Sequence, residues 1–90
     1  MRVKFLASLR DYTNCPETDV LAVPTVGDLA CVLAERYGPK FGEKLLTSEG
    51  ELGPEIVIMI NGRHVVHLGG IGAPLGDEDV VQIFPLVTGG

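Results

Sequence analysis

The chain has 90 residues, of which 46% are hydrophobic, so it can bury one small core and has no room for a second domain. Its formal net charge of −5 creates a field that repels phosphate backbones and anionic lipids, which argues against nucleic acid and membranes as partners. The N-terminal segment has neither the apolar core of a secretion signal nor the length of a membrane span, so we expect a soluble, cytoplasmic protein.

Alternating polarity opens the chain and predicts a first strand with one buried face. The apolar members of this pattern are Val3, Phe5, Ala7 and Leu9. Turn-forming residues fill positions 10–18, and residues 19–23 predict a second short strand. Together the two segments predict a hairpin.

Residues 25–37 carry the clearest helix signals in the chain. Thr25 is a suitable N-cap and Asp28 follows three residues later, as in a capping box. One face of this helix is apolar, with Val26, Leu29, Ala30, Leu33 and Tyr37. A glycine and a proline end it, and residues 39–46 predict a second, shorter helix.

The C-terminal half predicts three more strands. Residues 56–60, IVIMI, form a continuous apolar run that predicts a central strand covered on both faces or nearly so. Asn61 and Gly62 favour a tight hairpin turn, and residues 63–68 predict the returning strand. After a glycine-rich connection, residues 80–86 predict the last strand.

This order of elements predicts an α+β fold of the β-grasp type. We expect a mixed sheet of about five strands, with one main helix packed across it and a short second helix. The first and last strands are expected side by side in the middle of the sheet. The folded domain would span residues 1–84, and residues 85–90 would form a flexible tail ending in two glycines.

Residues that carry enzyme chemistry are sparse. The sequence holds no GxSxG, GxxxxGK[ST] or HExxH motif, so we expect no catalytic machinery of its own. Cys15 and Cys31 match neither a redox pair nor a zinc pattern and are expected to be free thiols. His64 and His67 would lie on opposite faces of a strand, so no metal site is predicted.

The final pair, Gly89 and Gly90, is the strongest functional candidate. It places an α-carboxylate at the end of a backbone without Cβ atoms, which can enter a narrow channel in a partner. Enzymes that activate a carboxylate with ATP need such access. The chemistry would then belong to the partner, and this chain would present the reactive group.

Five stretches of the chain resemble the MoaD/ThiS family of ubiquitin-like sulfur carriers, and within it the molybdopterin synthase small subunits in particular. These stretches are VKFLASLRDYTN, PTVGDLACVLAERYG, INGRHV, PLGDEDVVQIFP and the final VTGG. The resemblance implies that an E1-like enzyme of the MoeB/ThiF type uses ATP to adenylate Gly90. Sulfur from a donor such as a cysteine desulfurase then gives a thiocarboxylate, with no cofactor bound permanently to the chain.

The same resemblance implies that the tail enters the molybdopterin synthase large subunit and donates sulfur for the molybdenum cofactor. Phe84 would be the apolar anchor on partners, and His64 occupies a contact position that is often apolar in the family. Leu86 replaces the second proline of many relatives. The partner-binding residues implied in this way are Phe84, Pro85, Leu86, Val87, Thr88 and His64, next to the reactive Gly89 and Gly90.

Three alternatives remain open. In the first, the sulfur serves cysteine or thiamin biosynthesis, although thiamin carriers are usually shorter than this chain. In the second, Gly90 forms isopeptide bonds with lysines of other proteins, as in ubiquitin-like modifiers of archaea. In the third, the chain is a plain interaction module whose glycine pair has no role.

Overall fold

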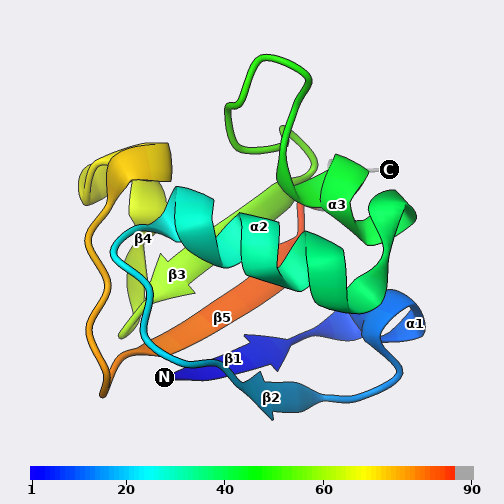
Figure 1. Cartoon of the computed structure of the whole chain (residues 1–90), viewed down its shortest axis with the longest axis horizontal. Helices are drawn as coiled ribbons and strands as arrows, with labels where there is room; N and C mark the ends of the chain where they lie inside the picture. The colour runs from blue at the N-terminus through cyan, green and yellow to red at the C-terminus, as the bar shows by residue number, and fades with distance from the viewer. Residues whose placement is uncertain (87–90) are drawn as a thin grey trace.

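The computed structural model describes residues 1–86 and contains one mixed five-stranded sheet. The strand order is β2-β1-β5-β3-β4, and only the central pair β1 and β5 is parallel. The strands are β1 (Arg2–Phe5), β2 (Glu17–Asp19), β3 (Ile56–Ile60), β4 (Arg63–His64) and β5 (Val80–Pro85). This topology confirms the predicted β-grasp fold and the central position of the first and last strands (Figure 1).

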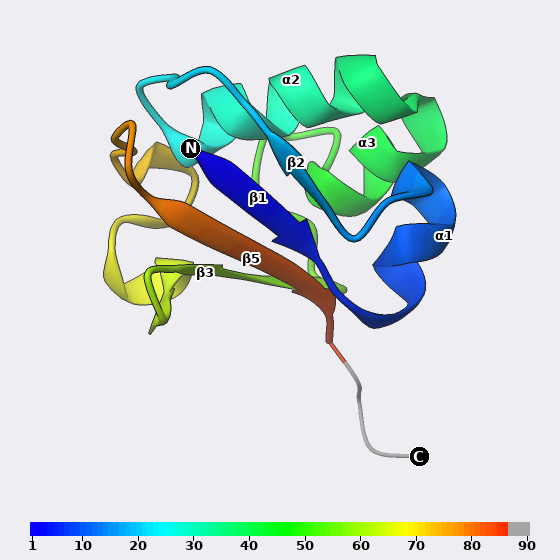
Figure 2. The same cartoon turned by 90° about the horizontal axis from the view of Figure 1, so that it is seen from below.

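Both longer helices cover the same face of the sheet, as Figure 2 shows. They are α2 (Val26–Tyr37) and α3 (Pro39–Leu45), close to the ranges that the sequence predicts. Thr25 caps α2 by accepting a hydrogen bond from the Asp28 amide at 3.3 Å. None of the helices in residues 1–86 has the length and apolar character needed to cross a membrane.

The core lies between these helices and the inner face of the sheet. The sheet contributes Val3, Phe5, Ile58, Ile60, Val81 and Ile83, and the helices contribute Val26, Leu29, Ala30, Leu33, Phe41 and Leu45. At one end of this layer Phe5 packs edge to face on Tyr37 and on Phe41, with ring centroids 5.5 and 5.7 Å apart.

The first strand is shorter than predicted. β1 ends at Phe5, and the chain turns through a 3₁₀ helix (Ala7–Leu9) into α1 (Arg10–Thr13). Ala7 adopts a positive φ of 52° and is exposed, so its predicted place on the buried face of a strand is wrong. Leu9 is nevertheless buried, because the helical turn brings it back to the core.

The second strand lies earlier in the chain than predicted. β2 covers Glu17–Asp19 rather than residues 19–23, and it does pair antiparallel with β1. Pairing with β1 fixes this edge strand, since its own side chains are mostly exposed. On its open edge the carbonyl oxygen of Asp19 accepts a hydrogen bond from Arg36 at 3.0 Å, which occupies one of the groups that could pair with another strand.

The predicted tight turn after β3 is confirmed, but the returning strand is mostly not. Asn61 and Gly62 have φ values of 51° and 83°, as this turn requires. β4 then ends at His64, and Val65–His67 form a 3₁₀ helix. The chain leaves the sheet edge here because Val65 inserts into the core, where it is 3% exposed. A further 3₁₀ turn, Gly70–Gly72, follows in the glycine-rich connection.

Candidate functional site

The face of the sheet opposite α2 and α3 is not covered by any element in residues 1–86, and Figure 2 shows it below β5 and β3. We call it the outer face. Because side chains alternate along a strand, it consists of the residues between the core positions. These are Arg2, Lys4, Glu17, Asp19, Val57, Met59, His64, Val80, Gln82 and Phe84.

The outer face divides into a polar and an apolar half. Arg2 bridges Glu17 and Asp19 on the β1–β2 side, with Nε–O distances of 3.2 and 3.3 Å. On the β5–β3 side, Phe84 stands directly opposite Val57. Met59 is their neighbour on β3, and all three side chains are half-buried. A cluster of partly exposed apolar side chains on one sheet face is typical of a protein interaction surface.

This cluster corrects the prediction for β3. The run IVIMI predicts a strand covered on both faces, whereas the structure buries Ile58 and Ile60 on the inner face only. Val57 and Met59 point to the uncovered face and remain half-exposed. A strand that is apolar on both faces therefore need not be covered on both faces within its own domain, because one face can bind a partner.

His64 lies at the β4 end of the outer face, opposite Met59, and is half-buried. Its Nδ1 accepts a hydrogen bond from the Val66 amide at 3.1 Å, so the neutral ring carries its proton on Nε2. The predicted separation of His64 and His67 on opposite faces is wrong. The 3₁₀ turn after β4 brings their rings edge to face with centroids 6.1 Å apart.

No group of three metal-ligating side chains occurs within residues 1–86. Two adjacent imidazoles alone do not supply the donor set of a structural or catalytic zinc site. The thiols lie elsewhere, Cys15 half-buried beside the Tyr37 hydroxyl and Cys31 exposed on α2. Both are free, as the sequence predicts.

The chain leaves the sheet beside the apolar half of the outer face. β5 continues through Pro85, and the Leu86 amide donates a hydrogen bond to the carbonyl oxygen of Glu55 at 2.8 Å. Leu86 is 48% exposed and borders a shallow pocket of about 240 Å³. The remaining lining residues are Ser8, Leu9, Tyr12, Lys44, Pro54, Glu55, Ile56 and Pro85.

An ion pair stands on the rim of this pocket. Lys44 Nζ lies 2.8 Å from Glu55 Oε2. The hydrogen bond and the charge of Glu55 raise the pKa of Lys44, and the same contacts lower the pKa of Glu55. Lys44 is therefore protonated over a wider pH range than an isolated lysine, which makes it a poorer nucleophile.

The structure places four predicted partner-binding residues on the outer face or at the end of β5, namely His64, Phe84, Pro85 and Leu86. Phe84 and His64 lie on the outer face, and Leu86 follows the half-buried Pro85 at the end of β5. The other predicted site residues, Val87, Thr88, Gly89 and Gly90, lie outside the described residues. Sequence reasoning missed Val57 and Met59, although the unbroken apolar character of IVIMI was a usable signal.

Comparison with known proteins gives consistent matches. Residues 3–90 match the ThiS family. Small archaeal modifier protein 3 of Haloferax volcanii is 42% identical over 66 residues, which cover 73% of this chain and 70% of that protein. An Archaeoglobus fulgidus protein whose name contains "sulfur carrier protein" is 39% identical over 66 residues, 73% of this chain and 74% of its own length. The solution structure of small archaeal modifier protein 1 from Methanosarcina acetivorans superposes with a TM-score of 0.84 at 33% identity, covering 99% of this chain and 94% of that one.

Proposed function

The chain belongs to the ThiS family of ubiquitin-like sulfur carriers and modifiers, and from this premise we propose that it carries sulfur as a thiocarboxylate on Gly90. An E1-like enzyme would transfer AMP from ATP to the Gly90 carboxylate and release pyrophosphate. A sulfur nucleophile, supplied by a donor such as a cysteine desulfurase, would then displace AMP. Adenylation is needed because AMP is a far better leaving group than oxide.

The observation that carries this proposal is the position of the apolar half of the outer face. Phe84 precedes Leu86 by two residues on β5, and Val57 stands opposite Phe84 on the neighbouring strand β3. A partner that covers this patch is therefore placed close to the residues that follow. The family match extends through residue 90 and so includes the glycine pair.

Intact mass provides the direct test. The full chain is incubated with an adenylating enzyme of the MoeB/ThiF type from the same organism, together with ATP and a sulfur donor. We expect the mass to rise by one oxygen-to-sulfur exchange, located on the C-terminal peptide. A chain lacking Gly90 is the matched control and should show no exchange. Unchanged mass in the complete reaction would contradict the proposal.

For the destination of the sulfur, we propose the dithiolene of molybdopterin, with this chain as the small subunit of molybdopterin synthase. In this role the tail would insert into the large subunit. A pull-down with the large subunit of the same organism tests it, and the thiocarboxylate form should convert the pterin precursor to the dithiolene product. If the chain acquires sulfur but neither binds the large subunit nor yields the dithiolene product, cysteine or thiamin biosynthesis replaces molybdopterin as the proposed destination.

A second candidate function is favoured by the two archaeal relatives that are named as modifier proteins. In this reading the activated Gly90 is attacked by a lysine of a target protein and forms an isopeptide bond. Mass spectrometry of tryptic digests from cells would show lysines that carry the C-terminal residues of this chain. Both functions use the same activated carboxylate, so finding such adducts would add to the carrier role without excluding it.

A further inference from the structure

Lys4 occupies an unusual position on the outer face. The pairing register places it directly opposite Gln82 on β5, which stands opposite Met59 on β3. Phe84 is two residues further along β5 on the same face, within the reach of a lysine side chain. Lys4 therefore borders the apolar half of the outer face and is itself exposed.

Most other cations are already used within the chain. Arg2 pairs with Glu17 and Asp19, and Lys44 pairs with Glu55. Arg10 donates to the carbonyl oxygen of Phe5 at 3.0 Å, and Arg36 bonds to Thr18 and Asp19. These bonds keep the four side chains oriented toward their own chain.

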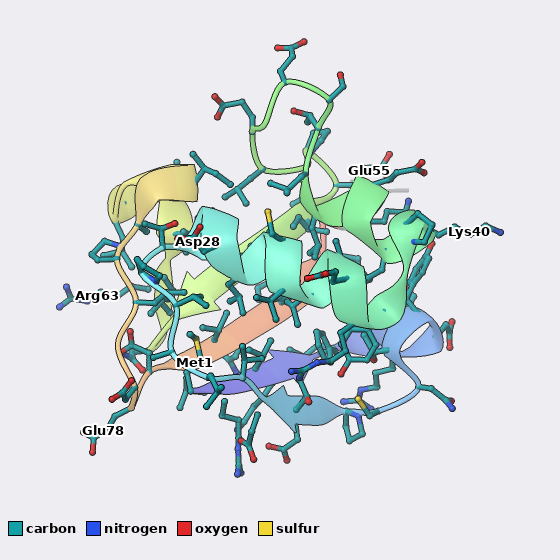
Figure 3. All side chains as sticks on the ribbon, in the orientation of Figure 1. Met1, Asp28, Lys40, Glu55, Arg63 and Glu78 are labelled. Atoms are coloured by element: carbon teal, nitrogen blue, oxygen red, sulfur yellow. The ribbon has the colours of Figure 1, made fainter. Side chains whose placement is uncertain are left out.

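Within residues 1–86, three cations make no ion pair or side-chain hydrogen bond, namely Lys4, Lys40 and Arg63. Lys40 lies on α3, and Arg63 stands opposite the buried Ile60, on the inner side of β4. Figure 3 shows both projecting away from the body of the molecule. Among the described residues, Lys4 is thus the unpaired cation of the outer face.

The acidic residue that stands opposite Lys4 on the sheet is bound to another cation. Glu17 stands directly opposite Lys4 in the β1–β2 register, but its carboxylate lies 3.2 Å from Arg2. A partner that covers Phe84 and Met59 also removes water from the border where Lys4 stands. Without an opposite charge, that desolvation weakens binding, whereas a carboxylate would make it favourable.

We propose that the adenylating enzyme places an acidic side chain against Lys4, beside the apolar surface that receives Phe84. This inference rests on the proposed function, since it assumes that the outer face binds this enzyme. The rest of the chain is acidic and repels acidic surfaces. Lys4 therefore selects a partner surface that is acidic at one point and apolar next to it.

The test compares dissociation constants for the adenylating enzyme of the same organism and the full-length variants. We expect Lys4→Glu to weaken binding by about tenfold or more, because two carboxylates would then face each other. Lys4→Met should weaken binding less than Lys4→Glu does. It should also make the dissociation constant less sensitive to the salt concentration. Lys40→Glu makes the same charge change away from the outer face and should alter the affinity by less than about twofold.

The outcomes separate this inference from the proposed function. If Lys4→Glu binds as tightly as Lys40→Glu while Phe84→Ala binds weakly and wild type acquires sulfur, only the role of Lys4 is overturned. If wild type neither binds the enzyme nor acquires sulfur, both are overturned. Thermal unfolding confirms that each variant is folded, which is expected because Lys4 is exposed.

Discussion

The two faces of the sheet are built by the same strands and differ in what covers them. Ile83 points inward and is 1% exposed, whereas the next residue, Phe84, points outward and is half-buried. Both are large and apolar, and a one-residue step along β5 separates them. The inner side chain contributes to the stability of the domain, and the outer one is available to a partner. Hydrophobicity alone therefore does not distinguish a core residue from a docking residue.

The largest expected effect tests the inner face. Ile83→Ala should lower the free energy of unfolding by about 2–5 kcal/mol, because it leaves a cavity in the core. Urea unfolding followed by circular dichroism measures this loss. At temperatures where the variant is still folded, its affinity for the adenylating enzyme should equal that of wild type. A loss of affinity in the folded variant would contradict the assignment of the inner face to stability and of the outer face to binding.

The neighbouring substitution tests the outer face. Phe84→Ala should cost about 1 kcal/mol of stability, since it removes one cross-strand contact with Val57. Its affinity for the adenylating enzyme should fall by about 30-fold, as for a central aromatic residue of an interface. Titration calorimetry measures the affinity. If Phe84→Ala lowers the free energy of unfolding as much as Ile83→Ala does, the two faces do not differ in their contribution to stability.

A smaller effect is expected at the turn that sets the register of β4. Gly62→Ala should cost about 1 kcal/mol, because Gly62 has a φ of 83° that residues with a Cβ adopt poorly. Gly72→Ala is the matched control, since no heavy atom lies within 4 Å of its added Cβ and its φ is not positive. Equal stability of the two variants by thermal unfolding would refute the argument.

The smallest effect belongs to the Lys44–Glu55 pair, which lies on neither face. The pKa of Glu55 is lowered from 4.5, so its stabilising contribution is present above that pH and is lost as the pH falls through the folded value. The pKa of Lys44 is raised from 10.5, so the pair also weakens in strong alkali. Melting temperatures of wild type and Glu55→Gln should differ slightly at neutral pH and converge in acid. A difference that grows in acid would contradict this assignment.

The sequence was most informative where local chemistry determines local structure. Thr25 and the apolar stripe of α2 defined that helix, and Asn61-Gly62 defined the turn after β3. The resemblance to the MoaD/ThiS family was confirmed by the match over residues 3–90. The β-grasp order followed from the number and spacing of the elements, which local signals locate well.

Errors arose where tertiary contacts outweigh local pattern. Val65 looks like a strand residue, but its insertion into the core ends β4 and brings His64 and His67 together. Ala7 continues the alternation of β1, yet the chain has already turned away at that point. For Val57 and Met59, the apolar pattern did not reveal which face a helix would cover, because that depends on the path of distant segments.

The central position of β5 has a mechanical consequence. Leu86 follows directly on a strand that is hydrogen-bonded on both sides, to β1 and to β3. A force that draws the chain end along the strand axis loads these two ladders in shear, so many hydrogen bonds must yield together. An edge strand pulled in the same direction would be held by one ladder only. The central position of β5 therefore protects the domain against a pull applied beyond Leu86 better than an edge position would.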